Sequence, residues 1–174
     1  MLLKVNEHQA YNVKCNLRIY ACPKILCSPT EWSLSQIFNE KIELNWTTQN
    51  LLPNHFSADL NWISKLDIAP KIVSSLATWS KLRFEVIQTP SNDVVGQRFS
   101  VTPELGIFRA DTNSLGETLL TESRISSAIL RTLQENTSIE QELDFMLGKP
   151  WDNDLEPFRN NQLDSCVKWI TKTG

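Results

Sequence analysis

Residues 13–38 read VKCNLRIYACPKILCSPTEWSLSQIF, and this stretch sets the fold of the first half of the chain. Apolar side chains alternate from Val13 to Ile19, which is typical of a β-strand with one buried face. Ser28-Pro29-Thr30-Glu31 then resembles a helix start, because serine and glutamate form a capping box around a proline at the first helical position. The stretch therefore predicts a strand followed by a helix over about residues 29–39.

The next elements complete a known arrangement. Alternation predicts strands over residues 41–47 and 56–62, which should pair as antiparallel neighbours. An apolar stripe from Ile68 to Trp79 predicts a second helix, and residues 82–86 predict the next strand. The order strand, helix, strand, strand, helix, strand predicts a ferredoxin-like βαββαβ unit with two helices on one face of the sheet. Trp32 and Phe38 of the first helix are expected to face that sheet.

The second half extends this unit. Residues 99–120 predict a β-hairpin whose polar turn contains Asp111, Asn113 and Gly116. That turn also has the spacing of several calcium-loop ligands, but a strand precedes it, which favours the hairpin. Thr121 should cap a helix over about 122–134 that turns Ile125, Ala128, Ile129 and Leu133 inward, and Ser138 should cap another, which Gly148 and Pro150 end. Residues 166–171 alternate as a closing strand.

The expected fold is thus α+β: a ferredoxin-like βαββαβ unit extended by a β-hairpin, C-terminal helices and a closing strand. Residues 1–12 form an N-terminal extension, and residues 13–174 form a single α+β domain, as a chain of 174 residues favours.

Composition and charge bound the function. The formal net charge of −3 and pI near 5.4 argue against nucleic acid as a partner. No apolar run is long enough to span a membrane, and the N-terminus lacks the pattern of a signal peptide, so we expect a cytoplasmic protein. The four cysteines are interpreted as small buried apolar side chains. With two histidines and no phosphate loop, we expect neither metal nor cofactor.

The segment Trp151–Arg159 holds the densest group of chemically able side chains. Asp152, Asp154 and Glu156 could act as an acid/base pair or bind Mg²⁺. The favoured alternative is structural: the acids stabilise the start of a short helix that Asp154 caps, Pro157 lies in its first turn, and Asp152 pairs with Arg159. Arg98, Glu104 and Arg109 are further candidates for an anion or acyl-carrier contact. The candidate binding residues are Arg98, Glu104, Arg109, Trp151, Asp152, Asp154, Glu156 and Arg159.

Several motifs resemble a known family. They are Leu26-Cys27 with Glu31-Trp32, Trp79 with residues 82–86, residues 102–108, Glu122 with Arg124, and Leu147-Gly148 with residues 151–159. Together they resemble an actinobacterial family of about 160 residues classed as a domain of unknown function, over about residues 17–172. The resemblance implies a link to type II fatty-acid synthesis, because genes of that family often lie beside genes of this pathway. The chain has Tyr20, Pro29 and Arg109 where the family is expected to carry histidines, which argues against histidine catalysis.

The sequence therefore favours a non-catalytic module that binds an unidentified protein or small-molecule ligand, in the setting of fatty-acid synthesis. The alternative is a carboxylate-dependent enzyme on an acyl or sugar substrate, using Asp152, Asp154 or Glu104 with an arginine. It requires at least two of these carboxylates to converge in one concave pocket. A homo-oligomer formed by pairing of sheet edges stays open.

Overall fold

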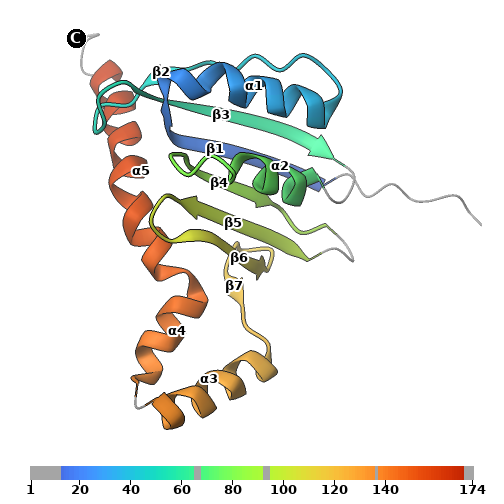
Figure 1. The fold of residues 1–174 in the computed structure, drawn as a ribbon, viewed down its shortest axis with the longest axis vertical. Helices are drawn as coiled ribbons and strands as arrows, with labels where there is room; N and C mark the ends of the chain where they lie inside the picture. Colours follow the sequence, from blue (N-terminus) through green and yellow to red (C-terminus); the bar gives the residue numbers. More distant parts are fainter. Residues whose placement is uncertain (1–12, 65–67, 92–94, 136, 171–174) are drawn as a thin grey trace, which may run out of the picture.

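A seven-stranded antiparallel sheet with helices on both faces forms the centre of the computed structural model, across its described residues 13–64, 68–91, 95–135 and 137–170 (Figure 1). Ser64 and residues 160–170 are described by their backbone alone. The expected N-terminal extension, residues 1–12, lies outside the described residues.

The strands are β1 (Val13–Pro23), β2 (Thr47–Thr48), β3 (His55–Ser64), β4 (Arg83–Gln88), β5 (Gly96–Thr102), β6 (Gly106–Thr112) and β7 (Thr118–Leu119). The helices are α1 (Lys24–Phe38), α2 (Ile68–Leu76), α3 (Glu122–Glu135), α4 (Ile139–Leu147) and α5 (Lys149–Ile170). The sheet order is β2-β3-β1-β4-β5-β6-β7, and each neighbouring pair is antiparallel.

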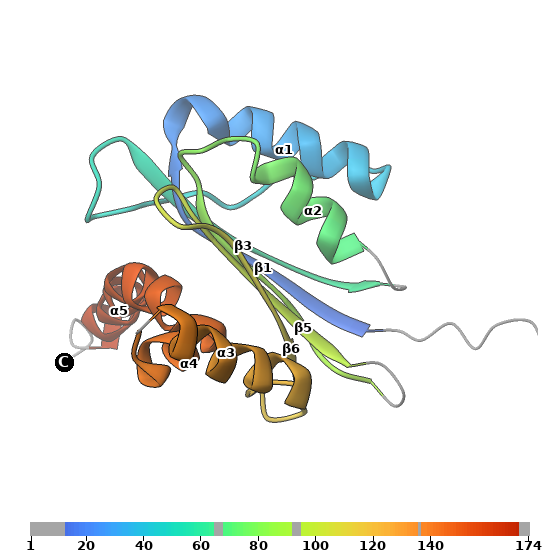
Figure 2. The ribbon, with the colours of Figure 1, turned by 60° about the horizontal axis from the view of Figure 1, so that its bottom comes forward.

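The ferredoxin-like unit is confirmed. β2, β3, β1 and β4 lie in the order that this topology requires, and α1 and α2 cover one face of the sheet (Figure 2). The main core lies between these two layers and includes fully buried Leu17, Ile72 and Phe84. The predicted hairpin is also present: β6 and β7 pair around the polar turn, and the preceding strand β5 pairs with the other edge of β6.

A β-bulge in β1 changes which way its side chains point. The register with β3 shifts between Ile19 and Cys22, and both of these residues belong to the core under α1 and α2. Tyr20 and Ala21 between them instead pack with Leu155 of α5. A bulge adds a residue to one strand and so re-aims the side chains beside it. Alternation from Ile19 places Tyr20 on the opposite face of the sheet, and the bulge keeps Ala21 on that face and returns Cys22 to the core.

The expected start of α1 was wrong. The helix begins at Lys24 directly after the strand, its N-cap Pro23 makes no side-chain cap bond, and Pro29 lies inside the helix. Once a helix has formed, each added residue contributes one more hydrogen bond without a new nucleation cost. The helix therefore extends toward the N-terminus past the local capping signal at Ser28. Phe38 packs against the core as expected, but Trp32 does not: 65% of it is exposed.

The strand expected over residues 41–47 is reduced to β2. Pairing with β3 is confirmed, but only through Thr47 and Thr48. Glu31 of α1 takes the place of further ladder bonds, because its Oε1 accepts from Leu44 N at 2.8 Å and from Trp46 Nε1 at 3.0 Å. The Glu31 carboxylate thereby accepts from a backbone amide that would pair with a neighbouring strand in a longer ladder, and it also accepts from the Trp46 indole.

The closing strand expected over residues 166–171 was also wrong, because residues up to Ile170 continue α5. α5 crosses the face of the sheet opposite α1 and α2 (Figures 1 and 2). It begins at Lys149, so Asp154 is not its N-cap and Pro157 lies inside the helix rather than in its first turn. The buried side chains of Leu155 and Phe158 hold this face on the sheet, and helical bonding extends from there.

α3 and α4 form what we call the α3–α4 arm, residues 122–135 and 139–147, which reaches beyond β7 (Figure 1). Its caps are as expected: Thr121 Oγ1 accepts from Arg124 N at 3.4 Å, and Ser138 Oγ accepts from Glu140 N at 3.3 Å. Gly148 ends α4 with a left-handed φ of 84°, whereas Pro150 lies inside α5. Of the α3 side chains expected to point inward, only Ala128 is buried.

No helix within the described ranges has both the length and the apolar character needed to cross a bilayer.

Candidate functional site

Glu85 of β4 is a buried carboxylate at the place where α5 crosses the sheet. Its neighbours Phe84 and Val86 point into the core under α1 and α2, so alternation turns Glu85 to the α5 face. Only 3% of Glu85 is exposed. Four groups donate hydrogen bonds to it: Tyr20 Oη at 2.6 Å, Arg159 Nη2 at 2.7 Å, and Arg98 Nη2 and Ser100 Oγ at 2.9 Å each. The buried charge is thereby fully compensated.

Asp152 of α5 supplies a second carboxylate to the same two arginines. Its Oδ1 accepts from Arg159 Nη2 at 2.9 Å and also from Arg98 Nη2. The predicted Asp152–Arg159 pair is therefore confirmed. Two arginines and two carboxylates alternate around a closed ring, which we call the ionic ring: Glu85, Arg98, Asp152 and Arg159.

Regular spacing brings these residues together. Glu85 and Ser100 are direct partners in the β4–β5 ladder, and Arg98 lies two residues from Ser100 on the same face. On α5, residues three and four apart share one face of the helix, which places Asp152 and Arg159 beside the buried Leu155. Tyr20 of β1 lies on the same face of the sheet and adds its hydroxyl, which also accepts from Arg159 Nε at 3.3 Å.

Arg83 forms a second group beside the ring. Its Nε donates to Asp154 Oδ2 at 3.2 Å and its Nη2 to Glu104 Oε2 at 3.0 Å, while its guanidinium stands 5.2 Å from the centre of the Phe158 ring. One arginine therefore ties α5 to the turn between β5 and β6. The two carboxylates at this place are both engaged by the same cation.

Trp151 anchors the start of α5 to the hairpin. Its Nε1 donates to the carbonyl of Gly106 at 3.0 Å, and its ring lies 5.1 Å from that of Phe108. Burial of an aromatic ring with its polar atom satisfied is a packing role.

Arg109 lies apart from these residues. Its register partner in β5 is Phe99, a core residue under α1 and α2, and its guanidinium is 5.8 Å from the Phe99 ring. Arg109 therefore occupies the opposite face of the sheet. Glu156 lies at the margin of the ionic ring, where its carboxylate is 3.5 Å from Arg159 and half of its side chain is exposed.

The structure thus gathers Arg98, Glu104, Trp151, Asp152, Asp154 and Arg159 where α5 meets the sheet and the β5–β6 hairpin. Four residues of the same region were missed by the sequence analysis: Tyr20, Arg83, Glu85 and Ser100. The available signal was the pair of charged residues at alternate positions of the strand 82–86, Arg83 and Glu85, but this alternation also suits a face open to water.

The charges of the ring set the ionisation of its members. Burial alone would raise the pKa of Glu85, but hydrogen bonds from Arg159 and Tyr20, with the charges of Arg159 and Arg98, lower it below its usual value. Burial, and then the charge of Glu85, raises the pKa of Tyr20 to about 12. At neutral pH Glu85 is an ionised acceptor and Tyr20 is a neutral donor. Neither has the pKa near 7 that suits a general acid or base.

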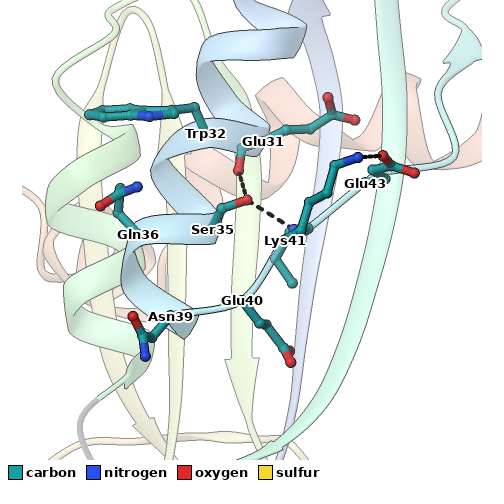
Figure 3. A pocket seen from close by; sticks show the side chains of 9 residues that line it. Glu31, Trp32, Ser35, Gln36, Asn39, Glu40, Lys41 and Glu43 are labelled. Atoms are coloured by element: carbon teal, nitrogen blue, oxygen red, sulfur yellow. Dashed lines mark hydrogen bonds and ion pairs between the residues drawn. The ribbon is translucent and has the colours of Figure 1, made fainter.

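A shallow groove of about 530 Å³ lies between α1 and the segment that follows it (Figure 3). Trp32 and Gln36 point to one side of α1, while Lys41 and Glu43 pair with each other at 2.5 Å on the other side. Glu31 holds the backbone of Leu44, as described above. Because the side chains diverge and are partly engaged with one another, the groove does not assemble a site.

No cluster suited to a metal is found among the described residues, taking groups of three or more His, Cys, Asp or Glu. Cys15 and Cys22 are buried, as expected of small apolar side chains, and Cys27 is partly buried. Burial raises the pKa of the Cys22 thiol to about 12, so it stays protonated and unreactive at neutral pH. The side chain of Cys166 lies outside the described residues.

The α3–α4 arm carries the second unusual feature. α3 exposes Ile125, Ile129, Leu130 and Leu133, and 77% of Leu133 faces water. α4 adds Ile139, Phe145 and Leu147. The two helices contact each other and are joined by an ion pair between Arg131 and Glu142 at 3.2 Å, while Ala128 is the buried residue of α3. Several large apolar side chains exposed together on a protruding element are typical of a recognition site.

Comparison with known proteins gives a family and no relative. A family model described as "Protein of unknown function (DUF3145)" matches residues 16–172. Among curated proteins, and among solved structures, nothing matches this chain.

Proposed function

The chain belongs to the family of proteins of unknown function DUF3145, and from this premise we propose that it is a non-catalytic binding module which docks another protein on its α3–α4 arm. The single observation that carries the proposal is the apolar face that the arm leaves exposed.

The energetics of α3 support a docked partner. A helix of 14 residues is near the lower limit of stability in water, so most helices of this length depend on an apolar face packed against other structure. In α3 the only buried residue is Ala128. Packing a large apolar side chain such as Leu133 contributes roughly 1.5–3 kcal/mol when it is fully covered. Covering the arm would therefore stabilise both the helix and the complex.

The ionic ring supports a binding role over catalysis. A general acid or nucleophile needs a carboxylate that is free to exchange a proton or reach a substrate. Here Glu85 and Asp152 both accept from Arg98 and Arg159, while Asp154 and Glu104 share Arg83. In this arrangement the arginines and carboxylates neutralise one another. Their role is to hold α5, and with it the arm, against the sheet.

Fatty-acid synthesis is the cellular setting that we propose, on the resemblance alone. The soluble proteins of that pathway are therefore the first panel of partners to test against the arm.

Quantitative pull-down from a native extract tests the proposal. The chain is compared with the double variant Ile129→Asp/Leu133→Asp and with the matched control Leu115→Asp, which places the same charge on a residue that is 81% exposed in the β6–β7 turn. Proteins retained by the wild type and the control but lost from the double variant support docking on the arm. Identical recovery with all three chains, self-association included, would refute it.

A further inference from the structure

We infer that the protein which covers the α3–α4 arm is a second copy of this chain, with the two α3 helices packed antiparallel across a two-fold axis near Ile129. This inference rests on the proposed function, because it names the partner of the same surface.

The size of the surface suits a dimer. Counting roughly 170 Å² for each fully exposed large apolar side chain, the seven exposed on α3 and α4 leave roughly 600 Å² of apolar surface in water. The largest apolar patch on a typical monomer covers about 300–600 Å². A standard interface takes about 800 Å² from each partner, polar rim included. The apolar surface of the arm is therefore at the upper limit for a monomer and close to what one half of a dimer contributes.

The exposed face of α3 is self-complementary. Ile125, Ile129 and Leu133 are spaced by four residues and form one stripe along the helix. In an antiparallel pair centred on Ile129, Ile125 meets the partner's Leu133, and each Ile129 meets its own copy. A two-fold axis brings every residue near its symmetry mate, so a charge in the centre of such a face would repel itself.

The charges of α3 lie away from the centre of this stripe. Arg131 is turned toward α4, where it pairs with Glu142. Two turns earlier along the same flank, Arg124 lines a hollow with Arg131 and Met146 of α4. The centre of the stripe thus contains apolar side chains alone, as a symmetric contact requires.

A second copy also meets the demand for a permanent cover. α3 has little internal packing, so a cover that is always available stabilises the helix most. A second copy of the chain is always available as a partner, because it is made together with the first. Pairing of sheet edges is a poorer route to a dimer, because the edge strands β2 and β7 are each two residues long, and short edge strands resist such pairing.

Sedimentation velocity of the full chain between about 1 and 100 µM tests the inference. The wild type and Leu115→Asp should sediment as dimers, and Ile129→Asp should raise the dissociation constant at least tenfold while its circular dichroism stays that of a folded chain. A wild type that is monomeric throughout this range, or a dimer that Ile129→Asp leaves unchanged, would overturn the inference.

Cross-linking tests the axis itself and does not require a charged substitution. Ile129→Cys should form a covalent dimer on mild oxidation, whereas Leu115→Cys should not, and this control also accounts for the native thiols. Equal cross-linking of the two variants, or none of either, would overturn the two-fold arrangement. A monomeric wild type that still retains another protein through the arm contradicts the dimer alone. If the arm also binds no other protein, the proposed function fails with it.

Discussion

Replacing Glu85 by glutamine should destabilise the protein strongly, because the ionic ring would lose the carboxylate at its centre. Glutamine keeps the shape of the side chain but removes the charge that faces Arg98 and Arg159. Breaking a buried ion pair costs about 3–5 kcal/mol. The arginine side chains are 17% and 24% exposed and both keep Asp152, so we expect the lower part of that range, about 3 kcal/mol.

Urea denaturation of the wild type and Glu85→Gln at pH 7 measures this loss. For a domain of 150–250 residues each 1 kcal/mol shifts Tm by about 2–4 °C, so thermal melting should fall by roughly 6–12 °C. Hydrogen exchange should rise first in α5, which the ring attaches to the sheet. Glu43→Gln is the matched control: Glu43 also forms an ion pair, with Lys41, but both side chains are exposed, and its unfolding midpoint should not change.

The effect has a defined pH dependence. The pKa of Glu85 in the folded protein lies below its usual value of 4.5. Its ionised form therefore stabilises the fold above about pH 4.5, and this stabilisation is lost as the pH falls through the depressed value. The gap between wild type and Glu85→Gln should be constant from pH 6 to 8 and shrink in acid. A loss below about 1 kcal/mol at pH 7, or a gap that stays unchanged in acid, would show that the ring does not hold α5.

Three further predictions concern other positions. Gly148→Ala should destabilise the protein by about 1–3 kcal/mol in urea denaturation, because Gly148 has a φ of +84° and an added Cβ would stand 2.5 Å from the Phe108 ring; unchanged stability would contradict the αL cap. Because the pKa of Tyr20 is raised from 10 to about 12, its contribution to stability should be complete below pH 10 and decline between pH 10 and 12. Tyr20→Phe should remove that part of the alkaline loss, and an identical pH profile in the variant would count against it. Pro29→Ala should raise the thermal midpoint, because it restores the missing amide donor inside α1; a lower midpoint would mean that packing of the proline ring outweighs the added hydrogen bond.

The local patterns of the chain were sufficient for most of its elements. Alternation identified β1, β3 and β4, and apolar stripes identified α2 and α3, because these periods follow from the geometry of strands and helices. The order of the elements then led to the ferredoxin-like unit. Boundaries were less accurate: α1 starts five residues before Pro29, the first helical residue that the capping signal predicted, and the alternation after Cys166 did not make a strand.

Part of the candidate site was predicted from the sequence. Asp152 and Arg159 were predicted to pair because they lie close together in a dense polar segment, and they do pair. Their common partner Glu85 was not predicted as part of the site. Arg159 and Glu85 are 74 residues apart, and their contact depends on α5 crossing β4. The Tyr20 hydroxyl reaches Glu85 because β1 and β4 are neighbours in the sheet and both side chains lie on the face that α5 covers.

Short-range order thus came from the chain itself: which segments are strands or helices, and which face of each is apolar. Tertiary structure decided which of those faces are covered. The face of β4 that carries Glu85 is buried by a helix from the far end of the chain, while the large apolar side chains of α3 stay between 38% and 77% exposed. Periodicity depends on neighbours in sequence, but burial depends on long-range contacts that no local pattern encodes.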